Sequence, residues 1–226
     1  MKAYVVEKEA LSHNIELLQK MANGVPIWAV LKGNGYGIGV LPLARHLAEA
    51  GIDHFCVTEV REAELLRENG FEDASILMLR STGDPAELNR LMDLRVILTI
   101  GSWGTACAIN AIAAERADVV EAHLKIDTGM GRYGFLPDEL DQLLPIFKYM
   151  PGLHVTGIYT HLHSAFCNQK ATIAQAEAFQ GVLDKLHAEG CGTGMAHMLN
   201  SAGLLKYPEY AMGGVRVLSL IHISEP

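Results

Sequence analysis

Basic and aromatic residues lie at the ends of several short apolar segments of this chain. Lys32 closes the apolar run IWAVLK, and the glycine-rich stretch GNGYGIG follows it. Partial burial disfavours the charged form of an amine, which makes it a better nucleophile toward a carbonyl. Lys32 could therefore bind an aldehyde covalently, or it could be a surface lysine before a flexible turn. The glycine spacing does not fit the GxGxxG dinucleotide fingerprint in any register.

A second candidate group lies in HLKIDTGMGRYGF, residues 123–135. This segment places Lys125, Asp127 and Arg132 around the end of an expected strand and a glycine-rich loop. Buried charges need partners. The pattern fits a functional site and a structural cluster of ion pairs equally well.

Two histidines, His161 and His163, lie on one face of the extended segment THLHSAF. Their spacing resembles that of metal ligands, but no third histidine or carboxylate ligand is near them in the sequence. We therefore expect no metal, and we expect a histidine that packs on or beside the ring of a ligand.

The stretch HMLNSAGLL places Asn200 and Ser201 where a strand turns into a helix. Both residue types are good helix caps, and the free N–H groups of a helix N-terminus bind phosphate. The loop after the seventh strand of a (β/α)₈ barrel is a frequent phosphate site, which favours that interpretation over capping alone. Arg216, in the last apolar run, is a permanent cation that could pair with an acid or with a ligand acceptor.

The elements that must position these residues alternate between short apolar runs and longer segments of helical periodicity. Such βα units imply a parallel sheet, and eight of them point to an α/β fold closed as a (β/α)₈ TIM-type barrel, although periodicity alone does not exclude an open doubly wound sheet. A short strand and a helix are expected within residues 3–23. The eight expected strands are Ile27–Leu31, His54–Val57, Ser75–Leu79, Val96–Thr99, Glu121–Ile126, Leu153–Tyr159, Gly194–Leu199 and Gly214–Val217.

The last residues of the chain, LSLIHISEP, fit this scheme poorly. A closing helix should follow the eighth strand, and these residues do not supply one. We expect one barrel domain over residues 1–217, without its last helix and with apolar strand surface left uncovered. We expect residues 218–226 to be an aberrant tail.

Composition limits the function classes. The 226 residues include 50% hydrophobic ones and carry a formal net charge of −8, so we expect neither nucleic-acid nor membrane partners. The four cysteines show no CxxC pairing and indicate free thiols in a reducing cytoplasm. The N-terminus lacks the apolar stretch of a signal peptide, and no run is long enough for a membrane helix.

Taken in order, these segments resemble the alanine racemase family over roughly residues 3–217. AVLKGNGYGIG is similar to the family's AVVKANAYGHG, and LKIDTGMGRYGF to its LKVDTGMGRLGF. THLHSAF, HMLNSA and VRV fall where the family has THFA, HxxNSA and DxVRxG. The resemblance implies an N-terminal barrel that binds pyridoxal 5′-phosphate (PLP). The whole enzyme would interconvert L- and D-alanine in the cytoplasm by two-base proton transfer, as a homodimer, and supply D-alanine for peptidoglycan.

The resemblance also implies roles for single residues. Lys32 would hold the cofactor covalently and act as one of the two acid/base groups. Arg216 would face the pyridine nitrogen, with His161 supporting it from the side. Arg132 would orient the second base and the substrate carboxylate. Tyr36 and Ser201, beside Asn200, would bind the cofactor phosphate, and Lys125 matches a lysine that is often carbamylated in the family.

Departures from the family pattern leave alternatives open. The family glycine after VRV and its further phosphate-binding stretch are replaced, and the C-terminal β-domain, which carries the second base, is absent. Residues 1–226 should therefore racemise poorly or not at all. One alternative is a single-domain PLP carrier without turnover, and another is a racemase of a different small amino acid such as serine. Ile38 replaces a family histidine, and two family alanines are glycines here, which would loosen the loop after Lys32.

Overall fold

Eight short strands run parallel around a ring in the computed structural model, which describes residues 6–217. Each expected strand is confirmed, with ends that differ by at most two residues. The strands are β1 (Ile27–Val30), β2 (His54–Val57), β3 (Ser75–Met78), β4 (Leu98–Ile100), β5 (Val120–Lys125), β6 (Leu153–Tyr159), β7 (Met195–His197) and β8 (Val215–Val217).

The ring is closed, so the fold is a barrel and not an open sheet. Two four-stranded sheets have the orders β3-β2-β1-β8 and β4-β5-β6-β7. A parallel bridge between Leu77 and Ile97 joins β3 to the segment leading into β4. On the other side, the Arg216 N–H on β8 donates to the Leu199 carbonyl just after β7, at 2.9 Å. The predicted (β/α)₈ architecture is therefore confirmed.

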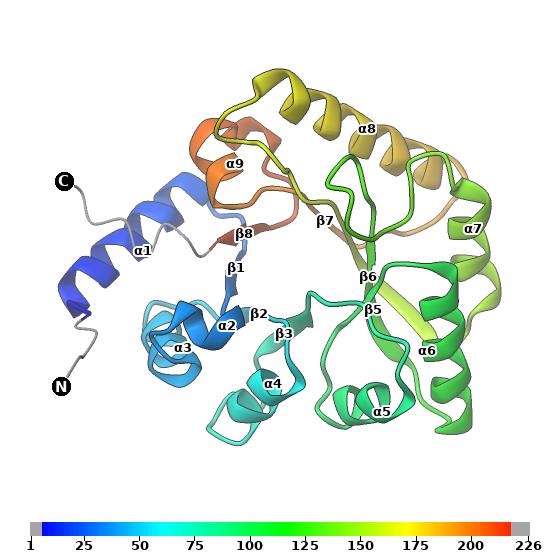
Figure 1. The fold of residues 1–226 in the computed structure, drawn as a ribbon, viewed down its shortest axis with the longest axis horizontal. Coiled ribbons are helices and arrows are strands. Elements are labelled where there is room, and N and C mark those ends of the chain that lie inside the picture. Colours follow the sequence, from blue (N-terminus) through cyan, green and yellow to red (C-terminus); the bar gives the residue numbers. More distant parts are fainter. Residues whose placement is uncertain (1–5, 218–226) are drawn as a thin grey trace.

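Helices surround the ring of strands (Figure 1). Several begin at a side-chain cap that the local sequence supplies, such as Asp84 before α5, Ser102 before α6 and Asn168 before α8. No helix within residues 6–217 is both long and apolar enough to cross a membrane. The helices are α1 (Lys8–Ala22), α2 (Lys32–Tyr36), α3 (Val40–Glu49), α4 (Val60–Arg67), α5 (Pro85–Asp93), α6 (Trp103–Glu115), α7 (Leu140–Tyr149), α8 (Gln169–Ala188) and α9 (Ser201–Lys206), with the short 3₁₀ helix η1 (Pro208–Tyr210).

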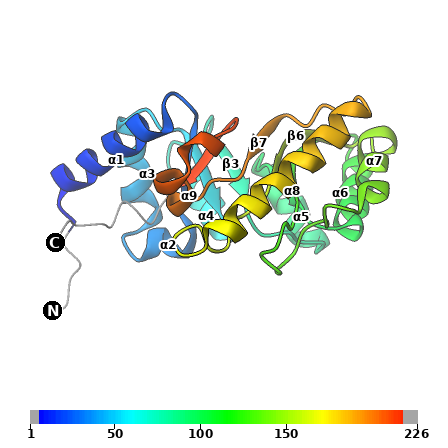
Figure 2. The ribbon, with the colours of Figure 1, turned by 90° about the horizontal axis from the view of Figure 1, so that it is seen from above.

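The expectation of uncovered strand surface at β8 is wrong. The exposed fractions of Val215 and Val217 are 0% and 1%. Helix α9 packs on β8, and α1 contacts α9 on the same side of the barrel (Figures 1 and 2). Helix α1 is also tied to α3 through a 3.0 Å hydrogen bond between Ser12 and His46. The helix before the first strand thus lies near the position that a helix after the eighth strand would take. The strand expected near residue 3 and the tail after Val217 lie outside the described residues.

Apolar side chains fill the space between strands and helices, whereas rings fill part of the barrel interior. Trp28 on β1 makes an edge contact with His123 on β5, with ring centroids 5.6 Å apart. Strands β1 and β5 belong to different sheets on opposite sides of the ring, so this contact crosses the interior. The floor of the barrel below the strand ends is therefore built from aromatic and imidazole groups.

Candidate active site

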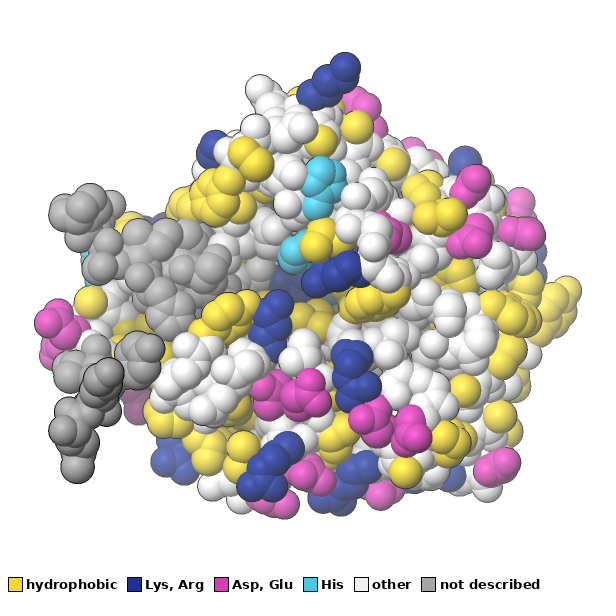
Figure 3. Space-filling model, in the orientation of Figure 1, with side chains coloured by type: hydrophobic (Ala, Val, Ile, Leu, Met, Phe, Trp, Pro, Cys, Tyr) yellow, Lys and Arg dark blue, Asp and Glu magenta, His cyan; other side chains and the backbone are white. Residues whose placement is uncertain are grey.

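A cavity of about 610 Å³ opens at the carboxyl ends of the strands. Active sites of (β/α)₈ barrels lie at this end, and the volume is typical of small-ligand sites. Figure 3 shows Lys, Arg and His side chains gathered around a hollow on this face. The tertiary structure brings most of the residues singled out in the sequence to this one cavity, whereas Asp127 lies outside its lining. The lining includes Lys32, Tyr36, Lys125, Arg132, His161, His163, Asn200, Ser201 and Arg216.

Lys32 is held by a tight left-handed turn. After it, Gly33, Asn34 and Gly35 take φ angles of 64°, 55° and 60°, a conformation that residues with a Cβ rarely adopt. The Asn34 N–H donates to the buried Glu62 carboxylate at 3.1 Å. The expectation that the two glycines loosen this loop stays a prediction. The stretch is a defined turn, because left-handed backbone favours glycine and because Glu62 anchors the turn to the start of α4.

Lys32 and Tyr36 lie together at the rim of the cavity. The Lys32 Nζ is 5.9 Å from the centre of the Tyr36 ring. Lys32 is half-buried, and Tyr36 is 52% exposed. The amine is therefore accessible to a small molecule that enters the cavity from solvent.

Lys125 is a buried lysine on β5. Its exposed fraction is 2%, and its Nζ donates to the Ile126 carbonyl at 2.6 Å. The amine lies 5.8 Å from the ring centre of Tyr133 and 5.6 Å from that of Tyr159. Burial lowers the pKa of Lys125 to about 7, against the opposing attraction of Asp127. A large share of these amines is therefore neutral near pH 7.

Asp127 organises the loop that carries Arg132. One carboxylate oxygen accepts the N–H groups of Gly129, Met130 and Gly131 at 2.7–3.1 Å, and the other accepts the Arg132 N–H at 3.0 Å. Burial raises the pKa of Asp127, but these backbone hydrogen bonds outweigh it and the net pKa is lowered. The structure does not contain the alternative, a cluster of side-chain ion pairs around Asp127. Backbone N–H groups donate to the Asp127 carboxylate, and the Lys125 amine donates to the Ile126 carbonyl.

Both histidines of THLHSAF line the cavity. His161 is half-buried, whereas His163 is exposed and hydrogen-bonds Ser164. Burial lowers the pKa of His161 to about 3, and the positive charges of Arg216 and Arg132 add to this effect. His161 is therefore a neutral imidazole at physiological pH.

Arg216 is a buried cation at the floor of the cavity, with an exposed fraction of 4%. Its guanidinium donates to His197 Nδ1 at 2.5 Å, to the His197 carbonyl at 3.1 Å and to the Thr160 carbonyl at 2.6 Å. The hydrogen-bonded histidine is thus His197, whereas the family resemblance assigns the supporting position to His161. The sequence signal for His197 is the histidine of HMLNSA, a motif that drew attention only for its Asn-Ser pair.

Asn200 caps the helix that begins at Ser201. Its Oδ1 accepts the Gly203 N–H at 2.9 Å, and its Nδ2 donates to the Leu162 carbonyl at 2.9 Å. The side-chain amide is therefore used in local structure, and it joins the loop after β6 to the start of α9. Ser201 is buried, with an exposed fraction of 5%, on the cavity wall.

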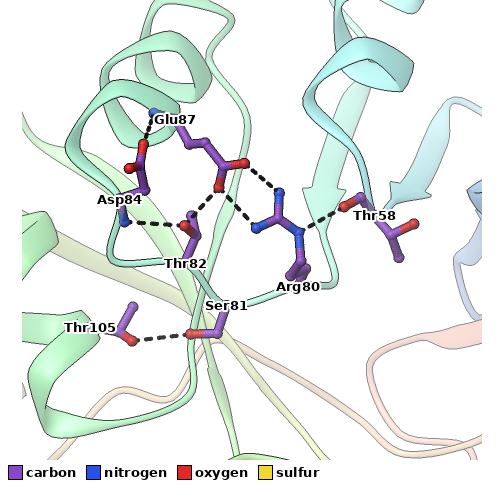
Figure 4. A network of polar contacts seen from close by, with 7 residues as sticks. All are labelled: Thr58, Arg80, Ser81, Thr82, Asp84, Glu87 and Thr105. Carbon is purple, nitrogen blue, oxygen red and sulfur yellow. Dashed lines mark hydrogen bonds and ion pairs between the residues drawn. The ribbon is translucent and has the colours of Figure 1, made fainter.

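Arg80 also reaches the cavity, from the end of β3 (Figure 4). Its two terminal nitrogens donate to the Glu87 carboxylate at 2.9 and 3.0 Å, and its Nε donates to the Thr58 carbonyl at 3.1 Å. Thr82 donates to the same carboxylate at 2.7 Å. This network neutralises Arg80 and braces the wall formed by the loops after β2 and β3.

The cavity is lined by basic groups in a chain of net charge −8, although Glu87 pairs with Arg80 and the Lys125 amine is partly neutral near pH 7. Its described lining contains five lysines and arginines and no carboxylate. A site of this kind selects for anionic groups such as phosphates and carboxylates, which accept hydrogen bonds from guanidinium and ammonium groups. Two primary amines, one half-buried and one buried, are available beside it.

Comparisons with known proteins agree with this geometry. A family model described as the alanine racemase N-terminal domain matches residues 6–219. The alanine racemase of Desulforamulus reducens is 38% identical over 215 residues, covering 93% of this chain and 57% of the relative. A serine/alanine racemase of Enterococcus gallinarum is 34% identical, covering 92% and 30%. The solved alanine racemase of Clostridium difficile 630 superposes with a TM-score of 0.90 at 26% identity, covering 96% and 57%. The chain thus spans between 30% and 57% of the length of these proteins.

Proposed function

Because this chain belongs to the alanine racemase N-terminal domain family, we propose that it forms the PLP-binding barrel of an amino-acid racemase. The whole enzyme would interconvert L- and D-alanine, act in the cytoplasm and supply D-alanine for peptidoglycan. The observation that carries the proposal is that Lys32, Lys125, Arg132 and Arg216 line one cavity at the carboxyl ends of the strands.

The residues present fit PLP. The cofactor is an aldehyde with a phosphate. The cavity offers an accessible amine and basic side chains, and no Asp or Glu is among the described residues that line it. Lys32 would hold the cofactor through its Nζ, while Tyr36 and Ser201 would bind the phosphate. When bound, PLP supplies an electron sink for the α-carbon of an amino acid.

The remaining residues would orient the substrate and set protonation states. Arg216 keeps its proton, so it would donate a hydrogen bond to the ring nitrogen of the cofactor without protonating it. Arg132, on the loop tied to Asp127, would pair with the substrate carboxylate. Lys32 Nζ would give or take the α-proton on one face, and His161, neutral, would pack beside the cofactor. Lys125 would be the site of carbamylation, because its neutral amine can react with carbon dioxide.

The second proton-transfer group and the dimer partner belong to the proposal for the whole enzyme. We place the second base on the partner's C-terminal domain and expect a homodimer that binds a small amino acid. Likeness to a serine/alanine racemase supports serine as a second substrate candidate. Assays of the whole enzyme with both amino acids would decide between them.

Titration of the chain with PLP tests the cofactor site. We expect the absorption band of lysine-bound PLP with the wild-type chain and with Lys20→Ala, a control at an exposed lysine of α1. Lys32→Ala should abolish the band. An equal band in Lys32→Ala would refute the assignment of Lys32. PLP binding by a whole enzyme that never exchanges the α-proton would favour a cofactor carrier.

A further inference from the structure

Three buried side chains form a hydrogen-bonded row beneath the cavity. Arg216 on β8 donates to His197 Nδ1 on β7 at 2.5 Å, and His197 Nε2 lies 3.0 Å from His123 Nδ1 on β5. Their exposed fractions are 4%, 0% and 2%. The row therefore runs from the cavity floor into the closed interior of the barrel.

The chemistry of these groups fixes where each proton lies. A guanidinium only donates, so His197 Nδ1 must accept with its lone pair. The proton of neutral His197 is then on Nε2, which makes it the donor to His123 Nδ1. His123 in turn carries its proton on Nε2. Burial, with Arg216 next, lowers the pKa of His197 well below its usual range and that of His123 to about 3, so both rings are neutral.

The surrounding packing holds this arrangement in place. The His197 ring stacks on Tyr159 at 5.0 Å and lies parallel to Trp28 at 6.2 Å. A Cβ added at Gly157 would lie 2.5 Å from His123 Nε2, so only glycine at that position leaves room for the imidazole. The two rings therefore have little freedom to turn.

Arg216 depends on these neutral acceptors for its orientation. Within residues 6–217 it forms no ion pair with a carboxylate, and its side-chain hydrogen bonds there go to His197 and to the Thr160 carbonyl. Tyr159 adds only a ring contact, 4.9 Å from the guanidinium carbon. His197 Nδ1 is the one side-chain acceptor among these partners, so the tautomer of His197 decides whether the guanidinium keeps this hydrogen bond in addition to those to the two backbone carbonyls.

We propose that His197 is a positioning residue that fixes Arg216 at the cavity floor, and that His123 locks His197 in the Nε2-protonated tautomer. The protonation pattern follows from the contacts alone, while its consequence for PLP rests on the proposed function. His197 touches no ligand site itself and acts through Arg216. The pair extends the functional unit into the barrel interior, beyond the residues that line the cavity.

Nitrogen NMR of the histidine-labelled chain tests the pattern without any cofactor. We expect His197 and His123 to show an unprotonated Nδ1 and a protonated Nε2, unchanged between pH 6 and pH 8. Arg216→Leu should remove this constraint on His197 and alter its nitrogen signals. A protonated His197 Nδ1 in the wild-type chain would overturn the proposal, whether or not PLP binds.

Variants of His197 test the consequence for the cofactor. An Asn side chain retains an acceptor oxygen near the position of Nδ1, so His197→Asn should keep the affinity for PLP within a few-fold of wild type. His197→Leu removes the acceptor and should weaken PLP binding about tenfold or more, the effect expected for loss of a hydrogen bond to a charged group. His54→Asn is the control, since His54 contacts Trp28 but lies outside the row.

Equal PLP affinity in the Asn and Leu variants, with similar melting temperatures, would contradict the positioning role. If His197→Leu does not fold, Gly157→Ala perturbs the same row from the side of His123. It should shift the His197 nitrogen signals and weaken PLP binding, and unchanged signals and affinity would count against the role of His123. Absence of PLP binding by the wild-type chain would refute the proposed function and leave the NMR result to decide the proton pattern.

Discussion

The buried amine of Lys125 should make the stability of this protein depend on pH. Its pKa falls from the ordinary value of 10.5 to about 7 on folding, because burial disfavours the ammonium form. Between these values the unfolded chain binds more protons at this position than the folded chain. The free energy of unfolding must therefore rise with pH across this window, and the cost of charging Lys125 is fully present below pH 7.

The size of the effect follows from the shift. Each unit of pKa corresponds to about 1.4 kcal/mol, so the whole shift is worth about 5 kcal/mol between the two protonation limits. From pH 7 to pH 9 the folded amine goes from half-protonated to neutral while the unfolded amine stays charged, which gives a rise of about 2 kcal/mol. Lys125→Met removes the titrating group and keeps most of the buried volume, so this rise should vanish in the variant.

Denaturant unfolding of the wild-type chain and Lys125→Met at pH 7 and pH 9 measures the difference. The buffers are kept free of carbon dioxide so that the amine stays unmodified, and Lys20→Met serves as the exposed control. Burial raises the pKa of Cys56 from 9.0 to about 12, so the unfolded thiol begins to ionise as the pH approaches 9, which lowers the free energy of unfolding in both proteins alike. The difference between the wild-type chain and Lys125→Met therefore isolates Lys125.

Two results would refute this reasoning. One is an equal pH dependence of unfolding in wild type and Lys125→Met. The other is a Lys125→Met variant that is less stable than wild type at pH 7. We expect the variant to be more stable there, because removing the buried charge should stabilise the fold by more than losing the hydrogen bond to the Ile126 carbonyl destabilises it.

Two other predictions concern the same loop and amine. Asp127→Asn should lower the free energy of unfolding by about 1–3 kcal/mol, because an amide cannot accept hydrogen bonds from all four backbone N–H groups. An unchanged denaturation midpoint, together with an unchanged rate of proteolysis within residues 127–134, would contradict this prediction. Addition of ¹³C-bicarbonate should give a carbamate NMR signal in the wild-type chain that is lost in Lys125→Met; a signal of the same size in both proteins would place the reaction elsewhere.

The amino-acid sequence alone determined the order of strands and helices and the kind of chemistry at the strand ends. Apolar runs such as IWAV and SILM contain too few polar residues to face water, and the alternation with helical segments admits only parallel pairing. Parallel strands joined by helical crossovers all end at one edge of the sheet. The positions of Lys32, Lys125 and Arg216 at or near the ends of such runs are therefore enough to predict that these residues share one site.

The tertiary structure alone decided closure, the cover over β8 and the partners of the buried cation. The contact between His123 and His197 joins residues 74 apart in the chain. Local periodicity says only that such side chains are buried. Which ring nitrogen meets which neighbour depends on strand register and on the space left at Gly157, and these arise only when the barrel closes. The proton pattern around Arg216 is therefore a property of the fold that no single segment encodes.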